Sequence, residues 1–184
     1  MKVKEILSYK ILIIGAGSSA LTLASKLVKE GENDIGIYSL AHGASPEIAG
    51  INFLTEDTIE ERELYVEDML KSGYRLNEIE HVKRMVGESF ETLGFMEEIG
   101  VEFDKDGRTY KKRHLSGHSK PRTLYNSKEF IGTNILKKQR NYLKDAGVNV
   151  NLRHECIDVR EVNGRKSALF IKDGELIEIY ADII

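Results

Sequence analysis

The sequence lacks the cysteines of a disulfide-stabilised protein and the long apolar runs of a membrane protein. Its single cysteine, Cys156, cannot form a disulfide within the chain, so we expect a protein of the reducing cytoplasm. The apolar run near the N-terminus, residues 11–14, leads into glycines and is far shorter than the roughly 20 residues that span a bilayer. The sequence therefore predicts neither a signal peptide nor a transmembrane segment.

An excess of charge of one sign is missing too. The chain has 27 Lys and Arg against 30 Asp and Glu, a net charge of -3. This balance provides no broad basic field for a nucleic acid or an anionic lipid surface, and we expect no nucleic-acid partner. Hydrophobic residues at 41% and charged residues at 31% are typical of a globular protein with one principal core.

Strand and helix patterns alternate in the N-terminal part. After a lead-in of nine residues, residues 10–14 are apolar beyond their lysine, which is typical of a buried strand. Apolar residues at helical spacing follow until Gly31, and residues 35–38 have the pattern of a second strand. Strand, helix and strand within about 30 residues predict a right-handed βαβ unit with parallel strands, over residues 1–52.

The middle of the chain has helical patterns and then loops. Asp57 and Glu60 have the spacing of a capping box, and Asn77 and Glu80 repeat it. Apolar residues at helical spacing follow each pair, so we expect two helices. The polar, glycine-punctuated sequence beyond them predicts loops with short extended pieces. Residues 53–130 are therefore predicted to form a helical and loop insertion.

The last part, residues 131–184, returns to strands after one helix. Asn163-Gly164 and Asp173-Gly174 are strong hairpin signals, which predict a small antiparallel meander. The final four residues lie where we expect another strand to begin. We therefore expect a single, truncated α/β domain over residues 1–184, Rossmann-like and of the FAD/NAD(P)-binding class. A sheet edge left open by the missing strand would favour self-association.

The sharpest chemical motif is Gly-x-Gly-x-x-Ala, which follows the first strand and opens the first helix. The first glycine allows a tight turn, the second lets the backbone approach a pyrophosphate, and the alanine lets the helix pack closely on the sheet. The helix N-terminus then presents free N–H groups to the anion. The alternative is a glycine turn in an unrelated α/β fold. The candidate cofactor-binding residues of this motif are Gly15, Ala16, Gly17, Ser18, Ser19 and Ala20.

The sequence favours FAD among the dinucleotides. An acidic residue usually ends the second strand and binds the ribose, but this chain has Ser39 there. No arginine follows to bind a 2′-phosphate, so NADP is not indicated. A long helical insertion after one βαβ unit is unlike a compact NAD-binding domain, although an NAD-binding module remains an alternative.

Three blocks of sequence resemble a known flavoprotein family. The first is ILIIGAGSSAL (residues 11–21), with Ser39 ending the second strand; the second is YVEDMLKSG (65–73), followed by GVEFD (100–104). The third is GHSKPR (117–122), with Gly132 opening the next helix. In order and spacing they resemble the L-aspartate oxidase and fumarate reductase–succinate dehydrogenase flavoproteins, the L-aspartate oxidases most of all, over residues 10–184.

The resemblance implies an FAD-dependent oxidoreductase that acts on a dicarboxylate. In an aspartate oxidase this is the oxidation of L-aspartate to iminoaspartate, the first step toward the nicotinamide ring of NAD; a succinate dehydrogenase or fumarate reductase type is the alternative. By position, the resemblance places the pyrophosphate at residues 16–19. It places the ribose at Ser39 and Leu40, the isoalloxazine along a loop with Ser45, Ala49 and Gly50, and the adenine at the backbone of Cys156 and Ile157.

The chain also departs from the family pattern. The flavin loop reads EIAGIN (residues 47–52) and is shorter than the usual loop with paired glycines. The family's residues that bind and process the dicarboxylate have no match within the chain. We therefore assign no catalytic residue, and expect a dicarboxylate to bind only together with the missing C-terminal part. The shortened loop favours a further alternative, a non-catalytic α/β scaffold without cofactor.

The remaining polar candidates have simpler explanations. His118, Ser119 and Arg122 could face the substrate, because arginine binds carboxylates bidentately; a loop held by polar contacts is the favoured alternative. His114 has i,i+4 spacing to His118, but the loop composition argues against a metal site. His42 is near the position of a flavin-linked histidine in succinate dehydrogenases, yet out of register.

Overall fold

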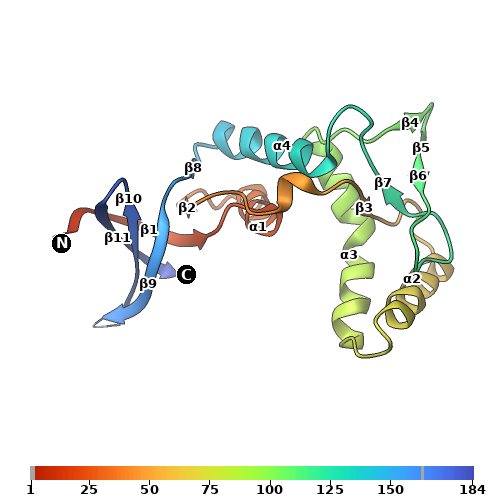
Figure 1. Ribbon diagram of the computed structural model, residues 1–184, viewed down its shortest axis with the longest axis horizontal. Helices are drawn as coiled ribbons and strands as arrows, with labels where there is room; N and C mark the ends of the chain where they lie inside the picture. Colours follow the sequence, from red (N-terminus) through yellow and green to blue (C-terminus); the bar gives the residue numbers. More distant parts are fainter. Residues whose placement is uncertain (1–2, 163) are drawn as a thin grey trace. The chain divides into compact units, whose positions relative to one another are not determined.

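A computed structural model of the chain describes residues 3–162 and 164–184. The chain forms two compact units. The first comprises the segments before Glu47 and after Ile135, and the second is Glu47–Ile135. The elements of both units are labelled in Figure 1. No helix in the described segments is long and apolar enough to cross a membrane.

The first unit is built on a six-stranded mixed sheet with the order β8-β2-β1-β11-β10-β9. Its strands are β1 (Val3–Ile14), β2 (Ile35–Tyr38), β8 (Val150–Asn151), β9 (Glu155–Val162), β10 (Arg165–Lys172) and β11 (Glu175–Ile183). β8, β2, β1 and β11 pair in parallel, whereas β10 pairs antiparallel with both β11 and β9. The predicted α/β class, the parallel βαβ unit and the antiparallel meander are thus confirmed.

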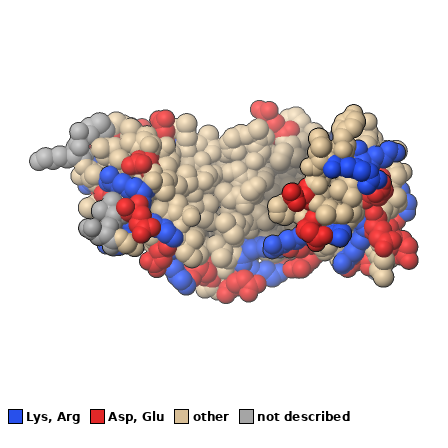
Figure 2. Space-filling model, turned by 90° about the horizontal axis from the view of Figure 1, so that it is seen from below, with Lys and Arg blue, Asp and Glu red and all other residues tan. Residues whose placement is uncertain are grey.

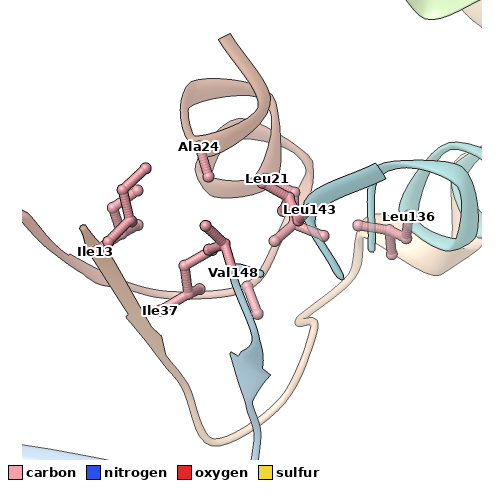
Figure 3. Close-up of a cluster of buried hydrophobic side chains, with 9 residues drawn as sticks. Ile13, Leu21, Ala24, Ile37, Leu136, Leu143 and Val148 are labelled. Carbon is pink, nitrogen blue, oxygen red and sulfur yellow. The ribbon is translucent and has the colours of Figure 1, made fainter. Parts of the chain in front are cut away.

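An apolar core joins the helices of this unit to one face of its sheet (Figure 3). Ile13 of β1 and Ile37 of β2 meet Leu21 and Ala24 of α1 (Ser18–Lys29). Leu136 and Leu143, from the C-terminal part of α4 (Ile131–Asp145), and Val148 complete the group labelled in the figure. Because α1 is anchored at its buried face, the glycine loop that precedes it is held at a fixed place beside the end of β1.

The structure corrects the expected start of the first strand. The predicted nine-residue lead-in is wrong, because β1 already begins at Val3 and pairs with β11 from Val3↔Leu176 to Ile11↔Ile183. Tyr9 of this added part packs over β2, where a Cβ at Gly36 would stand 2.6 Å from its ring. The longer strand therefore explains the glycine in β2.

The structure also corrects the prediction that a further strand begins at the final four residues. The final residues do not begin a new strand, because β11 runs through Ile183. β11 lies between β1 and β10, so the edge that we expected to be open is filled, and the edge strands of this sheet are β8 and β9. The Asp173-Gly174 turn is confirmed, with φ of 49° and 81°. Asn163 lies outside the described residues, while its flanking strands β9 and β10 pair as the hairpin requires.

The second unit contains two helices and short strands. The helices are α2 (Ile59–Ser72) and α3 (Ile79–Glu98), and the 3-10 turn η1 (Ser45–Glu47) lies where the chain passes from the first unit to the second. The strands are β3 (Ile51–Asn52), β4 (Lys105–Asp106), β5 (Thr109–Tyr110), β6 (Lys112–Arg113) and β7 (Thr123–Leu124). They form a three-stranded sheet, β3-β7-β6, and a two-stranded one, β4-β5. These elements agree with the predicted pair of helices and short extended pieces.

Both predicted capping boxes are wrong in register. The N-cap of α2 is Thr58, whose Oγ1 accepts the Glu61 N–H at 3.2 Å, and Asp57 instead forms an ion pair with Arg62. The N-cap of α3 is Glu78, which forms no side-chain cap. Thr58 and Glu61 have the same three-residue spacing as the predicted pair, one residue further on, so spacing alone could not distinguish them.

Replacing Thr58 with alanine is expected to lower the free energy of unfolding by about 1 kcal/mol, because the Glu61 N–H loses its acceptor. Replacing Asp57 with alanine removes only an exposed ion pair and should lower the free energy of unfolding by less than Thr58→Ala does. Urea unfolding of the two variants tests this. A larger effect at Asp57 would show that the cap is assigned to the wrong residue.

Candidate functional site

The glycine loop connects β1 to α1 in the first unit. Gly15 has a φ of +127°, which residues with a side chain rarely adopt, and its N–H donates to the Tyr38 carbonyl at 2.9 Å. The loop is thereby fixed to the end of β2 as well as to β1. Gly15 is thus a conformational necessity of the turn, as the motif predicted.

The N-terminus of α1 has the features of an anion-binding site. Its N-cap is Gly17, with no side-chain cap, and the first turn has no acidic residue. The Ser18 N–H donates to Ser45 Oγ at 3.0 Å, and the Ser18 hydroxyl oxygen is buried without a hydrogen-bond partner among the described residues. A buried, unpaired hydroxyl beside uncapped N–H groups at the positive end of a helix dipole fits a phosphate group.

Ser45 also explains why position 17 is a glycine. A Cβ at Gly17 would stand 3.0 Å from Ser45 Oγ and 3.6 Å from the His42 carbonyl oxygen. The close approach that the motif predicted at Gly17 is therefore made by a segment of this chain. The structure brings Ser45 together with residues 17 and 18, as the sequence-based site requires, although the cofactor contacts themselves stay predictions.

The predicted ribose and adenine residues lie in neighbouring segments of the first unit. The Ser39 N–H donates to the Asn151 carbonyl and the Ser39 carbonyl accepts from the His154 N–H, both at 3.0 Å. The Ser39 hydroxyl donates to the Ala41 carbonyl at 2.7 Å, so toward a ribose it would act as an acceptor. Leu40 is exposed. These bonds hold residues 39–40 next to the segment that leads into β9.

Cys156 and Ile157 lie near the start of β9, and their environments differ. Cys156 is half-buried and packs against the apolar cluster around Phe170, and burial raises the pKa of its thiol. Ile157 is exposed. A protonated, partly buried thiol is a poor nucleophile, so the structure gives Cys156 no nucleophilic role.

The predicted flavin-loop residues Ala49 and Gly50 belong to the second unit, where Gly50 has a packing role. A Cβ at Gly50 would stand 2.4 Å from Thr123 Cγ2 of β7. Close packing against β7 therefore accounts for the glycine. A contact of either residue with a flavin stays a prediction.

The substrate-side candidates Ser119 and Arg122 share one partner that the sequence analysis missed, Asp68 of α2. The Arg122 guanidinium is buried and forms an ion pair with Asp68, and its carbon lies 4.8 Å from the centre of the Tyr65 ring. Both the N–H and the hydroxyl of Ser119 donate to Asp68 Oδ2, at 3.0 and 2.9 Å. These bonds explain how the loop is held, as the favoured alternative proposed.

The ionisation of Asp68 follows from these contacts. Burial disfavours its charge, but the hydrogen bonds from the Ser119 backbone, Arg122 and the Ser119 hydroxyl outweigh burial and hold the pKa of Asp68 below its usual value. His118 is held separately, since Asn52 Nδ2 donates to His118 Nε2 at 3.1 Å. The described residues contain no group of three or more His, Cys, Asp or Glu placed to hold a metal ion. A substrate contact of His118, Ser119 or Arg122 stays a prediction.

Charges of both signs are interspersed on the face drawn in Figure 2. Several charged side chains of the second unit form ion pairs, such as Lys83 with Glu80 and Lys120 with Glu61. On this face, no extended area carries charges of one sign alone.

Comparisons with known proteins agree on one family. The family model described as FAD binding domain matches residues 10–182. The L-aspartate oxidase of Pyrococcus furiosus is 29% identical over 183 residues, which are 95% of this chain and 36% of that protein. The L-aspartate oxidase of Clostridium perfringens is 24% identical over 177 residues, 95% of this chain and 40% of that protein. The chain thus spans between a third and two fifths of the length of these relatives.

Solved structures of other proteins have a similar fold. The Mycobacterium smegmatis Sdh1 complex matches with a TM-score of 0.84 at 16% identity, covering 97% of this chain and 34% of that one. The E. coli quinol fumarate reductase FrdA matches with a TM-score of 0.82 at 18% identity, covering 97% and 32%. At such low identity these likenesses establish the fold alone.

Proposed function

Because the chain belongs to the FAD binding domain family, we propose that it holds the flavin of an oxidoreductase that converts L-aspartate to iminoaspartate in the cytoplasm, toward NAD biosynthesis. The uncapped N-terminus of α1, with its glycine loop and the unpaired Ser18 hydroxyl, is the observation that carries the binding part of this proposal. The L-aspartate oxidases among the relatives support the choice of aspartate. A fumarate reductase or succinate dehydrogenase type is the second candidate, supported by the structural likenesses.

The glycine-loop residues would hold the pyrophosphate of FAD. Ser45 Oγ already accepts the Ser18 N–H, so its own hydrogen is free to donate to a phosphate oxygen. The dipole of α1 stabilises the negative charge, and Lys26 and Lys29 lie at its opposite end, where cations are favoured. Ser39 and Leu40 would meet the ribose, and Cys156 and Ile157 the adenine. When bound, FAD supplies two-electron oxidation and reduction.

The relatives are longer than the part that this chain matches. The matched part covers 36–40% of those relatives. We propose that the dicarboxylate binds only with such further residues. By itself, this chain is expected to hold FAD without turning over substrate.

Anaerobic mixing distinguishes the two candidate substrates. The protein that contains this domain together with its substrate-binding part is loaded with FAD and mixed without oxygen with L-aspartate or with succinate. Bleaching of the oxidised flavin spectrum by L-aspartate alone supports the proposal. Bleaching by succinate alone would favour the second candidate. A protein that retains no FAD would contradict the proposal and favour a non-catalytic α/β scaffold without cofactor.

A further inference from the structure

His42 lies between the glycine loop and α4, within the first unit. Its Nδ1 is 2.7 Å from the Ala16 carbonyl oxygen, and its Nε2 is 3.5 Å from a terminal nitrogen of Arg140. A carbonyl oxygen can only accept, so Nδ1 must carry the hydrogen; a guanidinium can only donate, so Nε2 must present its lone pair. Both contacts therefore require the same neutral tautomer, with the hydrogen on Nδ1.

The Ala16 carbonyl belongs to the peptide whose N–H is that of Gly17. This peptide is planar and trans, so its N–H points away from the carbonyl and from His42. Among the described residues the Gly17 N–H has no hydrogen-bond partner. By fixing the carbonyl, the imidazole fixes the direction of a free N–H donor at the start of α1.

We propose that His42 is a positioning residue for the pyrophosphate: it locks the Ala16–Gly17 peptide so that the Gly17 N–H is oriented toward the anion before FAD arrives. This rests on the proposed FAD binding. A fixed donor loses less conformational entropy on binding than a peptide that must first rotate, so the effect appears in affinity. Because both ring nitrogens of His42 are hydrogen-bonded, neither is free for a covalent bond to a flavin. His42 would therefore differ from the flavin-linked histidine of succinate dehydrogenases.

The tautomer is measurable without FAD. A long-range ¹H–¹⁵N correlation spectrum of labelled protein, at a pH where the imidazole is neutral, should show His42 protonated at Nδ1. Free histidine prefers the hydrogen on Nε2, so the expected result is the less common form. A spectrum with Nε2 protonated, or with the two tautomers averaged, overturns the proposed hydrogen bond.

Side-chain replacements test the positioning role through FAD affinity. The amide nitrogen of asparagine can take the place of Nδ1, whereas that of glutamine lies nearer to Nε2. His42→Asn should keep the dissociation constant within about threefold of the wild type, while His42→Ala and His42→Gln should weaken binding about tenfold, the loss expected for one hydrogen bond and its preorganisation. Titration calorimetry with FAD measures this, and melting temperatures confirm that the variants are folded.

The controls separate this role from the proposed function. His81 is exposed on α3, so His81→Asn should bind FAD like the wild type. Equal affinity in all three His42 variants, or equal loss in all three, contradicts positioning by an Nδ1 donor. Failure of the wild type to bind FAD overturns the proposed function and the role toward FAD together, whereas the tautomer spectrum judges the His42 contact independently.

Discussion

Replacing Asp68 with alanine is expected to lower the free energy of unfolding of the second unit by about 3–5 kcal/mol, because it leaves a buried guanidinium without its counter-charge. The side chains of Asp68 and Arg122 are only 9% and 4% exposed, so water cannot replace the lost contact. Two further nitrogens of Arg122, Nε and Nη2, already have no hydrogen-bond partner among the described residues. The Ser119 N–H and hydroxyl lose their acceptor as well. Urea unfolding followed by circular dichroism measures the change.

Two controls identify charge pairing as the cause. The double replacement Asp68→Leu with Arg122→Met removes both charges and should cost less than Asp68→Ala alone. The folded-state pKa of Asp68 is lowered, so its stabilisation is fully present above the unfolded pKa of about 4 and is lost as pH falls through the folded value. The stability difference between the wild type and Asp68→Asn should therefore shrink in acid. A difference that stays constant with pH would contradict an ionised Asp68.

Replacing Gly17 with valine is expected to weaken FAD binding at least 100-fold, about 2.7 kcal/mol, while the domain still folds. The backbone conformation at Gly17, with φ of -79°, is open to any residue, so a side chain there causes no backbone strain. A Cβ would, however, stand 3.0 Å from Ser45 Oγ and would displace it from the Ser18 N–H. The added methyl groups would also occupy the approach to the uncapped end of α1.

A glycine elsewhere provides the matched control for this effect. A Cβ at Gly87, in α3, would meet no atom within 4 Å, so Gly87→Ala should leave FAD affinity unchanged and stabilise the helix by up to about 1 kcal/mol. Fluorescence titration of FAD with each variant gives the affinities. Wild-type affinity in Gly17→Val would place the cofactor away from the glycine loop.

The parts of the fold that could be predicted from sequence are those set by local patterns. A short apolar strand, a glycine turn and an amphipathic helix lie next to one another in the chain, and the Asp173-Gly174 turn fixes its hairpin by backbone conformation alone. Residues 3–9 have no such pattern. They become a strand because they pair with β11, about 170 residues away, and no local sequence pattern indicates that pairing.

For the candidate site, too, only residues within a local sequence pattern could be predicted. Gly15 and Gly17 were found because the motif is contiguous, whereas Asp68 was missed because its partners Ser119 and Arg122 follow more than 50 residues later. One signal was available: Asp68 shares the buried face of α2 with Tyr65, and a carboxylate on an apolar face requires a partner. The role of His42 could not be read from sequence, because it depends on the orientation of one ring against one carbonyl.

The most direct test of the central claim is the visible absorption spectrum of the purified chain after FAD has been added and the excess removed by gel filtration. The account predicts flavin absorption that stays with the protein and is released on denaturation, as expected for a cofactor held without a covalent bond. A colourless protein that retains none of the added FAD would contradict it.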